Sequence, residues 1–159
     1  MKRSSVFLFS TLCCLFATSA CADEGLNEIG QAFVKAFKAG DLEAIVALYA
    51  PDAVSFPPDA MTANGQEEIR KSWGGLLNKF NVQDLIVTNA RHQTSGDLST
   101  AWGNFKMILL PKEGGDQVVM EGRFTDVAKQ VNGKWLYVND HSSVPLPPPP
   151  EPQPSKGQG

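Results

Sequence analysis

Apolar side chains recur at helical spacing in the first part of the chain. One face of an expected helix carries four of them: Leu26, Ile29, Phe33 and Phe37. Intervals of three and four residues are those of a single helix face. Gly40 follows. Glycine readily takes the left-handed conformation that ends helices, so we expect this helix to stop there.

A second helix is expected directly after this stop. Asp41 can accept a backbone N–H bond at the start of the helix, and Pro51 would end it. The apolar positions of this helix are Leu42, Ile45, Val46 and Tyr49. Residues 53–56 are then predicted to form a strand.

A third helix is predicted over residues 66–78, where Gly65 precedes the helical pattern and residues 60–64 form a short returning strand. Its buried side would carry Ile69, Trp73, Leu76 and Leu77.

Strands separated by turn sequences follow from Val82 onward. The turns are expected at residues 95–97, 112–116 and 132–133, and the last is an Asn-Gly pair typical of a two-residue hairpin. Four long strands joined by three hairpins make an antiparallel meander. With three helices over its concave face, the fold class is α+β: a curved, mostly antiparallel sheet shaped like a cone.

The strands carry apolar residues on both faces. Trp102 and Ile108 would point one way, and the opposite face would carry Phe105, Met107 and Leu109. A sheet with one solvated face alternates more cleanly. We therefore expect a homodimer that pairs through the outer face, with simple exposure of some of these side chains as the alternative.

The first residues have the pattern of a secretory signal peptide. Lys2 and Arg3 precede an uncharged run over residues 6–17, and small residues follow. Cleavage after Ala22 would make residues 1–22 the signal peptide and the protein periplasmic or secreted. The alternative is a lipoprotein anchored through an acylated Cys21. Residues 23–144 have the size of one domain, and the proline-rich residues 145–159 are expected to form an extended tail.

The charge and composition of the chain limit the kinds of molecule that it is expected to bind. Without residues 1–22 the chain holds 12 basic and 17 acidic residues, a net charge of −5, and no cysteine. The basic residues do not cluster, so nucleic-acid binding is not expected. His92 and His141 alone make a weak metal site, and no glycine-rich phosphate loop is present. We expect neither a metal nor a cofactor.

The two tightly joined helices and the strand after them resemble the opening of the nuclear transport factor 2-like superfamily, in its SnoaL-like and ketosteroid-isomerase-like branch. Residues 135–143, WLYVNDHSS, are similar to the W-x-(I/V)-x-x-D-H-x-S segment that closes such domains. The resemblance implies a pocket in the cone for a small, largely apolar organic ligand.

Candidate site residues come from this closing strand and from the expected mouth of the cone. Alternation would place Tyr137, Asn139 and His141 on one face with Trp135. His141 could act as a general base supported by Asp140, or be a structural histidine. The expected ligand-binding residues are Tyr49, Trp73, Trp102, Asn104, Arg123, Trp135 and Tyr137, and Asp59 also belongs to the cone mouth.

Comparison with ketosteroid isomerase itself argues against steroid isomerisation. The resemblance puts Pro57 where that enzyme has its general base, and Phe33 where it has its tyrosine. Its second hydrogen-bond donor would match Gly122, or Glu121 if the alignment slips. Three functions stay open: ligand binding, an isomerase, cyclase or hydratase using His141 with Asp140, and a non-catalytic association module.

Overall fold

The computed structural model describes residues 27–58 and 60–146. Within them the chain forms three helices and six strands, in the order α1 Glu28–Lys38, α2 Leu42–Val46, β1 Tyr49–Phe56, β2 Ala63–Asn64, α3 Gly65–Lys79, β3 Phe80–Ser95, β4 Leu98–Pro111, β5 Val118–Val131 and β6 Lys134–Ser143. The expected signal peptide, Cys21, Asp59 and residues 147–159 of the expected tail lie outside the described part.

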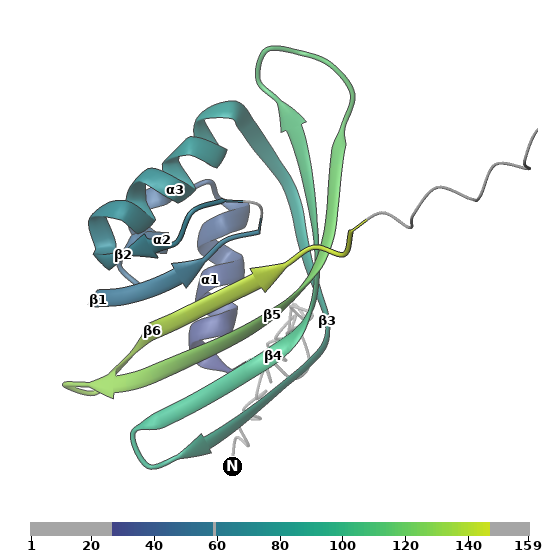
Figure 1. Ribbon diagram of the computed structural model, residues 1–159. Coiled ribbons are helices and arrows are strands. Elements are labelled where there is room, and N and C mark those ends of the chain that lie inside the picture. The colour runs from purple at the N-terminus through teal and green to yellow at the C-terminus, as the bar shows by residue number, and fades with distance from the viewer. Residues whose placement is uncertain (1–26, 59, 147–159) are drawn as a thin grey trace, which may run out of the picture.

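The strands form one sheet in the order β2-β1-β6-β5-β4-β3. Only the β1–β6 pair is parallel among these strands, and the others are antiparallel. The sheet is open and curved, and the helices pack on one side of it, with α1 behind the sheet in the view of Figure 1. The predicted α+β fold and the meander from β3 to β6 are confirmed.

The helix stop and the helix start are where the sequence predicts them. The Asp41 N–H donates to the Ala36 carbonyl at 3.0 Å, and Gly40, at φ +64°, donates to the Phe37 carbonyl at 2.9 Å. These two bonds form the C-terminal motif in which a left-handed residue ends the helix. The Asp41 side chain then accepts from the Ala44 N–H at 3.0 Å and starts α2.

The second helix is shorter than predicted. It ends at Val46, and Tyr49, expected on its apolar side, is the first residue of β1. Pairing with β6 overrides the helical pattern, because the Tyr137 N–H already donates to the Leu48 carbonyl at 2.8 Å. Pro51 lies inside β1 where the register with β6 shifts between Tyr49 and Val54. A strand tolerates proline at such an irregularity.

The Asn132-Gly133 hairpin is confirmed, with φ of +51° and +78° at its two residues, as a two-residue turn of this kind needs. The core lies between the helices and the concave face of the sheet. Its most enclosed large side chains are Tyr49, Phe37, Ile45, Ile69, Leu109 and Val46. No helix in the described part of the chain is long and apolar enough to cross a membrane.

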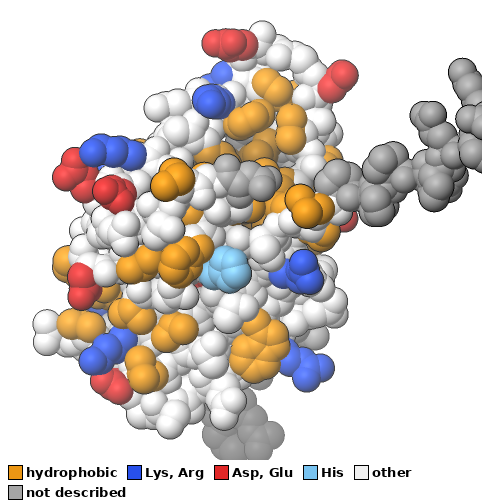
Figure 2. Space-filling view, in the orientation of Figure 1, with side chains coloured by type: hydrophobic (Ala, Val, Ile, Leu, Met, Phe, Trp, Pro, Cys, Tyr) orange, Lys and Arg blue, Asp and Glu red, His pale blue; other side chains and the backbone are white. Residues whose placement is uncertain are grey.

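The other face of the sheet, here called the outer face, carries exposed apolar side chains. They include Phe56, Ile86, Leu98, Trp102, Leu110 and Val119. Figure 2 shows hydrophobic side chains across the middle of this face and charged ones mainly toward its edges. The expected alternation in β4 is confirmed, since Phe105, Met107 and Leu109 are buried while Trp102 is 39% exposed. Pairing of two chains through this face stays a prediction.

Candidate functional site

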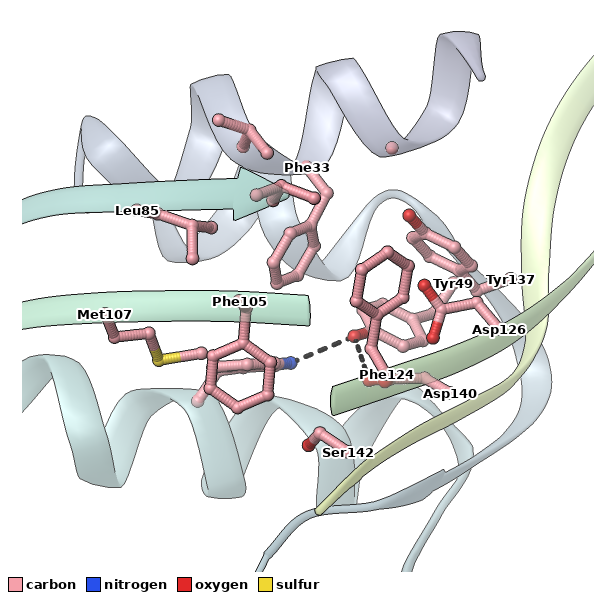
Figure 3. A pocket seen from close by; sticks show the side chains of 14 residues that line it. Phe33, Tyr49, Leu85, Phe105, Met107, Phe124, Asp126, Tyr137, Asp140 and Ser142 are labelled. Atoms are coloured by element: carbon pink, nitrogen blue, oxygen red, sulfur yellow. Dashed lines mark hydrogen bonds between the residues drawn. The ribbon is translucent and has the colours of Figure 1, made fainter. Parts of the chain in front are cut away.

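A cavity of about 60 Å³ lies between α1, α3 and the concave face of the sheet. Six of its 14 lining residues are aromatic: Phe33, Tyr49, Trp73, Phe105, Phe124 and Tyr137. Aliphatic side chains and Met107 complete the apolar part, and the charged groups on the wall are the carboxyls of Asp126 and Asp140. Figure 3 shows Phe33 reaching from α1 toward the rings of Phe105 and Phe124, with the two aspartates at one end.

A chain of hydrogen bonds holds Asp140 in place. Its Oδ2 accepts from the Tyr49 hydroxyl at 2.7 Å and from the Ser55 hydroxyl at 3.0 Å. The Trp73 indole N–H donates to the Tyr49 oxygen at 3.1 Å. Helix α3 and strands β1 and β6 are therefore joined at this point, and the orientation of Asp140 is fixed from two sides.

Asp126 and Asp140 face each other across the β5–β6 pair and are hydrogen-bonded through their side chains. Burial, the negative charge of Asp140 and the hydrogen bond to it hold the pKa of Asp126 well above its usual value. Burial also raises the pKa of Asp140, against the hydrogen bonds from Tyr49 and Ser55, which lower it. The pair therefore keeps a shared proton to a higher pH than two separate aspartates would.

One oxygen of this pair is unsatisfied. Oδ1 of Asp126 is enclosed and has no hydrogen-bond partner within the described residues. Burial also raises the pKa of both Tyr49 and Tyr137, so the two phenols near the pair stay neutral. The site offers acidic and phenolic groups in an apolar setting, which suits hydrogen bonding or proton transfer.

A bulge in β6 corrects the expected placement of His141. Ala128 pairs with Tyr137 and Val127 pairs with Asn139, so Val138 has no opposite residue in this pairing. One extra residue reverses the facing of every later side chain. Asp140 therefore faces the cavity, whereas His141 is exposed and lies edge-on to the Phe56 ring at 6.0 Å. The prediction that Tyr137 and His141 share a face is wrong.

The other expected residues divide between the two faces. Tyr49, Trp73 and Tyr137 line the cavity. Trp102 and Arg123 are exposed, and Asn104 pairs with Arg123 beside a shallow outer groove, because these positions alternate with the inward Phe105 and Phe124. Trp135 borders a separate recess next to the start of α1. The prediction that Trp102, Asn104, Arg123 and Trp135 line the cavity together with Tyr49, Trp73 and Tyr137 is therefore wrong.

The structure shows what lies at the positions that the resemblance matches to the hydrogen-bond donors of ketosteroid isomerase. Phe33 lines the cavity, as an inward position on α1 should. A Cβ on Gly122 would lie 2.5 Å from the Phe105 ring and 2.4 Å from the Ser143 carbonyl oxygen, so no side chain fits there. Glu121 is exposed and pairs with Lys106 at 2.8 Å, so it does not supply the missing acid.

Three of the cavity residues were not identified from the sequence: Asp126, Phe105 and Phe124. The alternation of side chains along β5 could have identified Asp126. The inward-facing positions of this strand are Gly122, Phe124, Asp126 and Ala128, so an acid lies among residues that are otherwise apolar. Across residues 27–58 and 60–146, no group of three or more His, Cys, Asp or Glu residues is placed to hold a metal ion.

Comparisons with known proteins agree with this architecture. The model of the SnoaL-like domain family matches residues 31–138. No curated protein matches the chain.

Three solved structures illustrate the likeness. A ketosteroid isomerase-like protein from Erwinia carotovora is 19% identical over 75% of this chain and 92% of its own, with a TM-score of 0.65. A candidate dehydratase of the nuclear transport factor 2-like family from Streptomyces avermitilis is 18% identical over 75% and 93%, with a TM-score of 0.67. A candidate scytalone dehydratase from Novosphingobium aromaticivorans is 13% identical over 74% and 80%, with a TM-score of 0.65.

At these identities the structures establish the fold, and the match over residues 31–138 establishes the family. The chain belongs to the SnoaL-like domain family, with the nuclear transport factor 2-like fold.

Proposed function

We propose that the protein binds a small, largely apolar organic molecule in the cavity between α1, α3 and the sheet. The observation that carries this proposal is the composition of the wall: six aromatic side chains, with polar groups gathered at one end. Apolar walls with a few convergent polar groups are typical of small-molecule sites. The polar end, around Asp126 and Asp140, would orient the ligand.

The size of the cavity limits what can enter without movement. Its volume is about 60 Å³, whereas an apolar cavity of about 150 Å³ is known to hold benzene. Phe33, Trp73 and Phe124 are only half-buried. A ligand with a ring would enter by displacing one of these three side chains.

A cavity-filling variant tests the proposal. Val87 lines the cavity, and the next residue, Thr88, is exposed on the outer face. Small apolar fragments should give saturation-transfer NMR signals with the unaltered protein and with Thr88→Phe, but not with Val87→Phe. Equal signals from both variants would place the binding elsewhere, and an absence of signals from the unaltered protein would contradict the proposal.

Proton transfer is a second candidate function, favoured by the raised pKa of Asp126. An isomerase, cyclase or hydratase acting in this cavity would use Asp126 with Asp140, since His141 faces away from it. The test is deuterium incorporation from D₂O into a bound ligand. Incorporation that persists in Asp126→Asn and in Asp140→Asn would contradict this function.

Two further proposals concern the setting of the domain. Export with removal of residues 1–22, or anchoring through Cys21, is supported by the charged start and the uncharged run after it. Pairing of two chains through the outer face is supported by its exposed apolar side chains, among them Trp102 and Val119.

A further inference from the structure

The polar end of the cavity combines two acidic side chains with a lining that holds no basic side chain among the described residues. None of the 14 described residues that line the cavity is Lys, Arg or His. A buried charge is unfavourable unless a group of opposite sign or a set of hydrogen bonds compensates it. Asp140 accepts hydrogen bonds from Tyr49 and Ser55, and the charge of His141 acts on it from outside the cavity, but no positive side chain in the described part of the chain lines the cavity beside the pair.

We propose that the ligand is a protonated amine with a small apolar or aromatic body, its ammonium group bound by Asp126 and Asp140. This inference rests on the proposed function, since it names the chemistry of the molecule held in the same cavity.

The orphaned oxygen gives the proposal its geometry. While the pair keeps the proton shared between their side chains, Asp126 and Asp140 together carry one negative charge. With that proton engaged between the two carboxyls, Oδ1 of Asp126 is left as an acceptor without a donor among the described residues. An N–H group of the ligand would supply the donor, and an ammonium would also balance the charge.

The walls suit the same ligand. Phe33 packs against Trp73 with ring centres 5.4 Å apart and against Tyr137 at 6.3 Å, so several ring faces gather around the cavity. Aromatic faces attract cations. A neutral alcohol would satisfy the hydrogen bond but leave the charge unbalanced, and a carboxylate ligand would be repelled by the pair.

Two pairs of probes separate charge from shape. Benzylammonium is compared with benzyl alcohol, and the smaller isobutylammonium with isobutanol, which allows for the limited volume of the cavity. The reporter is the indole N–H signal of Trp73 in two-dimensional NMR, because this group donates to Tyr49 at the cavity wall. The exposed Trp102 provides an internal control in the same spectrum.

We expect the ammonium of at least one pair to bind about tenfold tighter than its alcohol, or more. Equal affinity of ammonium and alcohol would overturn the amine proposal while leaving the proposed function standing. If none of the four probes shifts the Trp73 signal, both the amine proposal and the proposed function are contradicted.

A double variant tests whether the carboxyl pair is the cause. Asp126→Asn with Asp140→Asn keeps the shape of both side chains and removes the negative charge. It should abolish the preference for the ammonium over the alcohol. Glu121→Gln removes one negative charge from the exposed outer face and should preserve the preference. A preference for the ammonium that survives in the double variant would overturn the proposal. If the double variant does not fold, the affinities of ammonium and alcohol for the unaltered protein decide the question.

Discussion

Replacing Asp126 by Asn should change how the stability of the protein depends on pH. Burial and the charge of Asp140 hold the pKa of Asp126 well above its usual value in the folded protein. In the unfolded chain this pKa returns to about 3.9. Between these two values the folded protein binds a proton that the unfolded chain has already released.

The sign of the effect follows from this difference. A raised folded pKa contributes stability that is complete below about pH 3.9 and is lost as the pH rises toward the folded value. For one group the loss is at most about 1.4 kcal/mol of unfolding free energy per pH unit. The pKa of Asp140 is raised as well, so its contribution has the same sign.

The Asn variant should lose the part of the slope that belongs to Asp126. The amide of Asn can donate to Asp140 at every pH, so Asp126→Asn should gain stability relative to the unaltered protein as the pH rises from 5 to 8. The measurement is urea unfolding by tryptophan fluorescence at several pH values. Identical slopes for the two proteins would refute the assignment of a shared proton to this pair.

Asp84→Asn is the matched control. Lys38 lies 2.7 Å from Asp84, and their hydrogen bond lowers the pKa of this carboxyl. The contribution of Asp84 is therefore present above the unfolded pKa and is lost as the pH falls, which is the opposite sign. Asp84→Asn should therefore be less stable than the unaltered protein above about pH 3.9, and the difference should disappear toward the acidic end.

Three further outcomes are expected. Gly122→Ala should destabilise the fold by about 1 to 3 kcal/mol, whereas Gly75→Ala, in open space on α3, should be neutral or stabilising by up to about 1 kcal/mol; thermal unfolding compares them, and equal effects would refute the packing argument. Trp102→Lys should shift the mass in light scattering from dimer toward monomer, and a monomeric unaltered protein at micromolar concentration would contradict the dimer. The intact mass of the exported protein should correspond to a chain that begins at Asp23, whereas a lipid-modified cysteine would support the anchored alternative and an uncleaved chain would contradict both.

Local chemistry explains which elements the sequence could predict. Gly40, Asp41 and the Asn132-Gly133 pair each act through their own backbone, so their effects do not depend on the rest of the fold. The apolar alternation in β4 was sufficient for the same reason, because this strand keeps a regular register over Phe105 to Leu109 with β5.

The site required information that one strand does not contain. The bulge at Val138 arises from the pairing of β6 with β5, and it alone decides that Asp140 faces the cavity and His141 does not. The pKa of Asp126 likewise depends on Asp140, 14 positions further along the chain. The two residues meet only because of the β5–β6 register, which cannot be read from the sequence. Tyr49, predicted to be helical, belongs to a strand because it pairs with Tyr137 of β6, whose N–H donates to the Leu48 carbonyl.

The most direct test of the account is to locate ligand binding with the indole signals of the full chain during titration with a library of small apolar fragments. Trp73 lines the cavity, and Trp102 lies on the outer face. The account predicts that some fragments shift the Trp73 signal, leave the Trp102 signal unchanged, and lose this effect in Val87→Phe. Fragments that shift only Trp102, or none that shift Trp73 at millimolar concentration, would contradict a ligand-binding cavity.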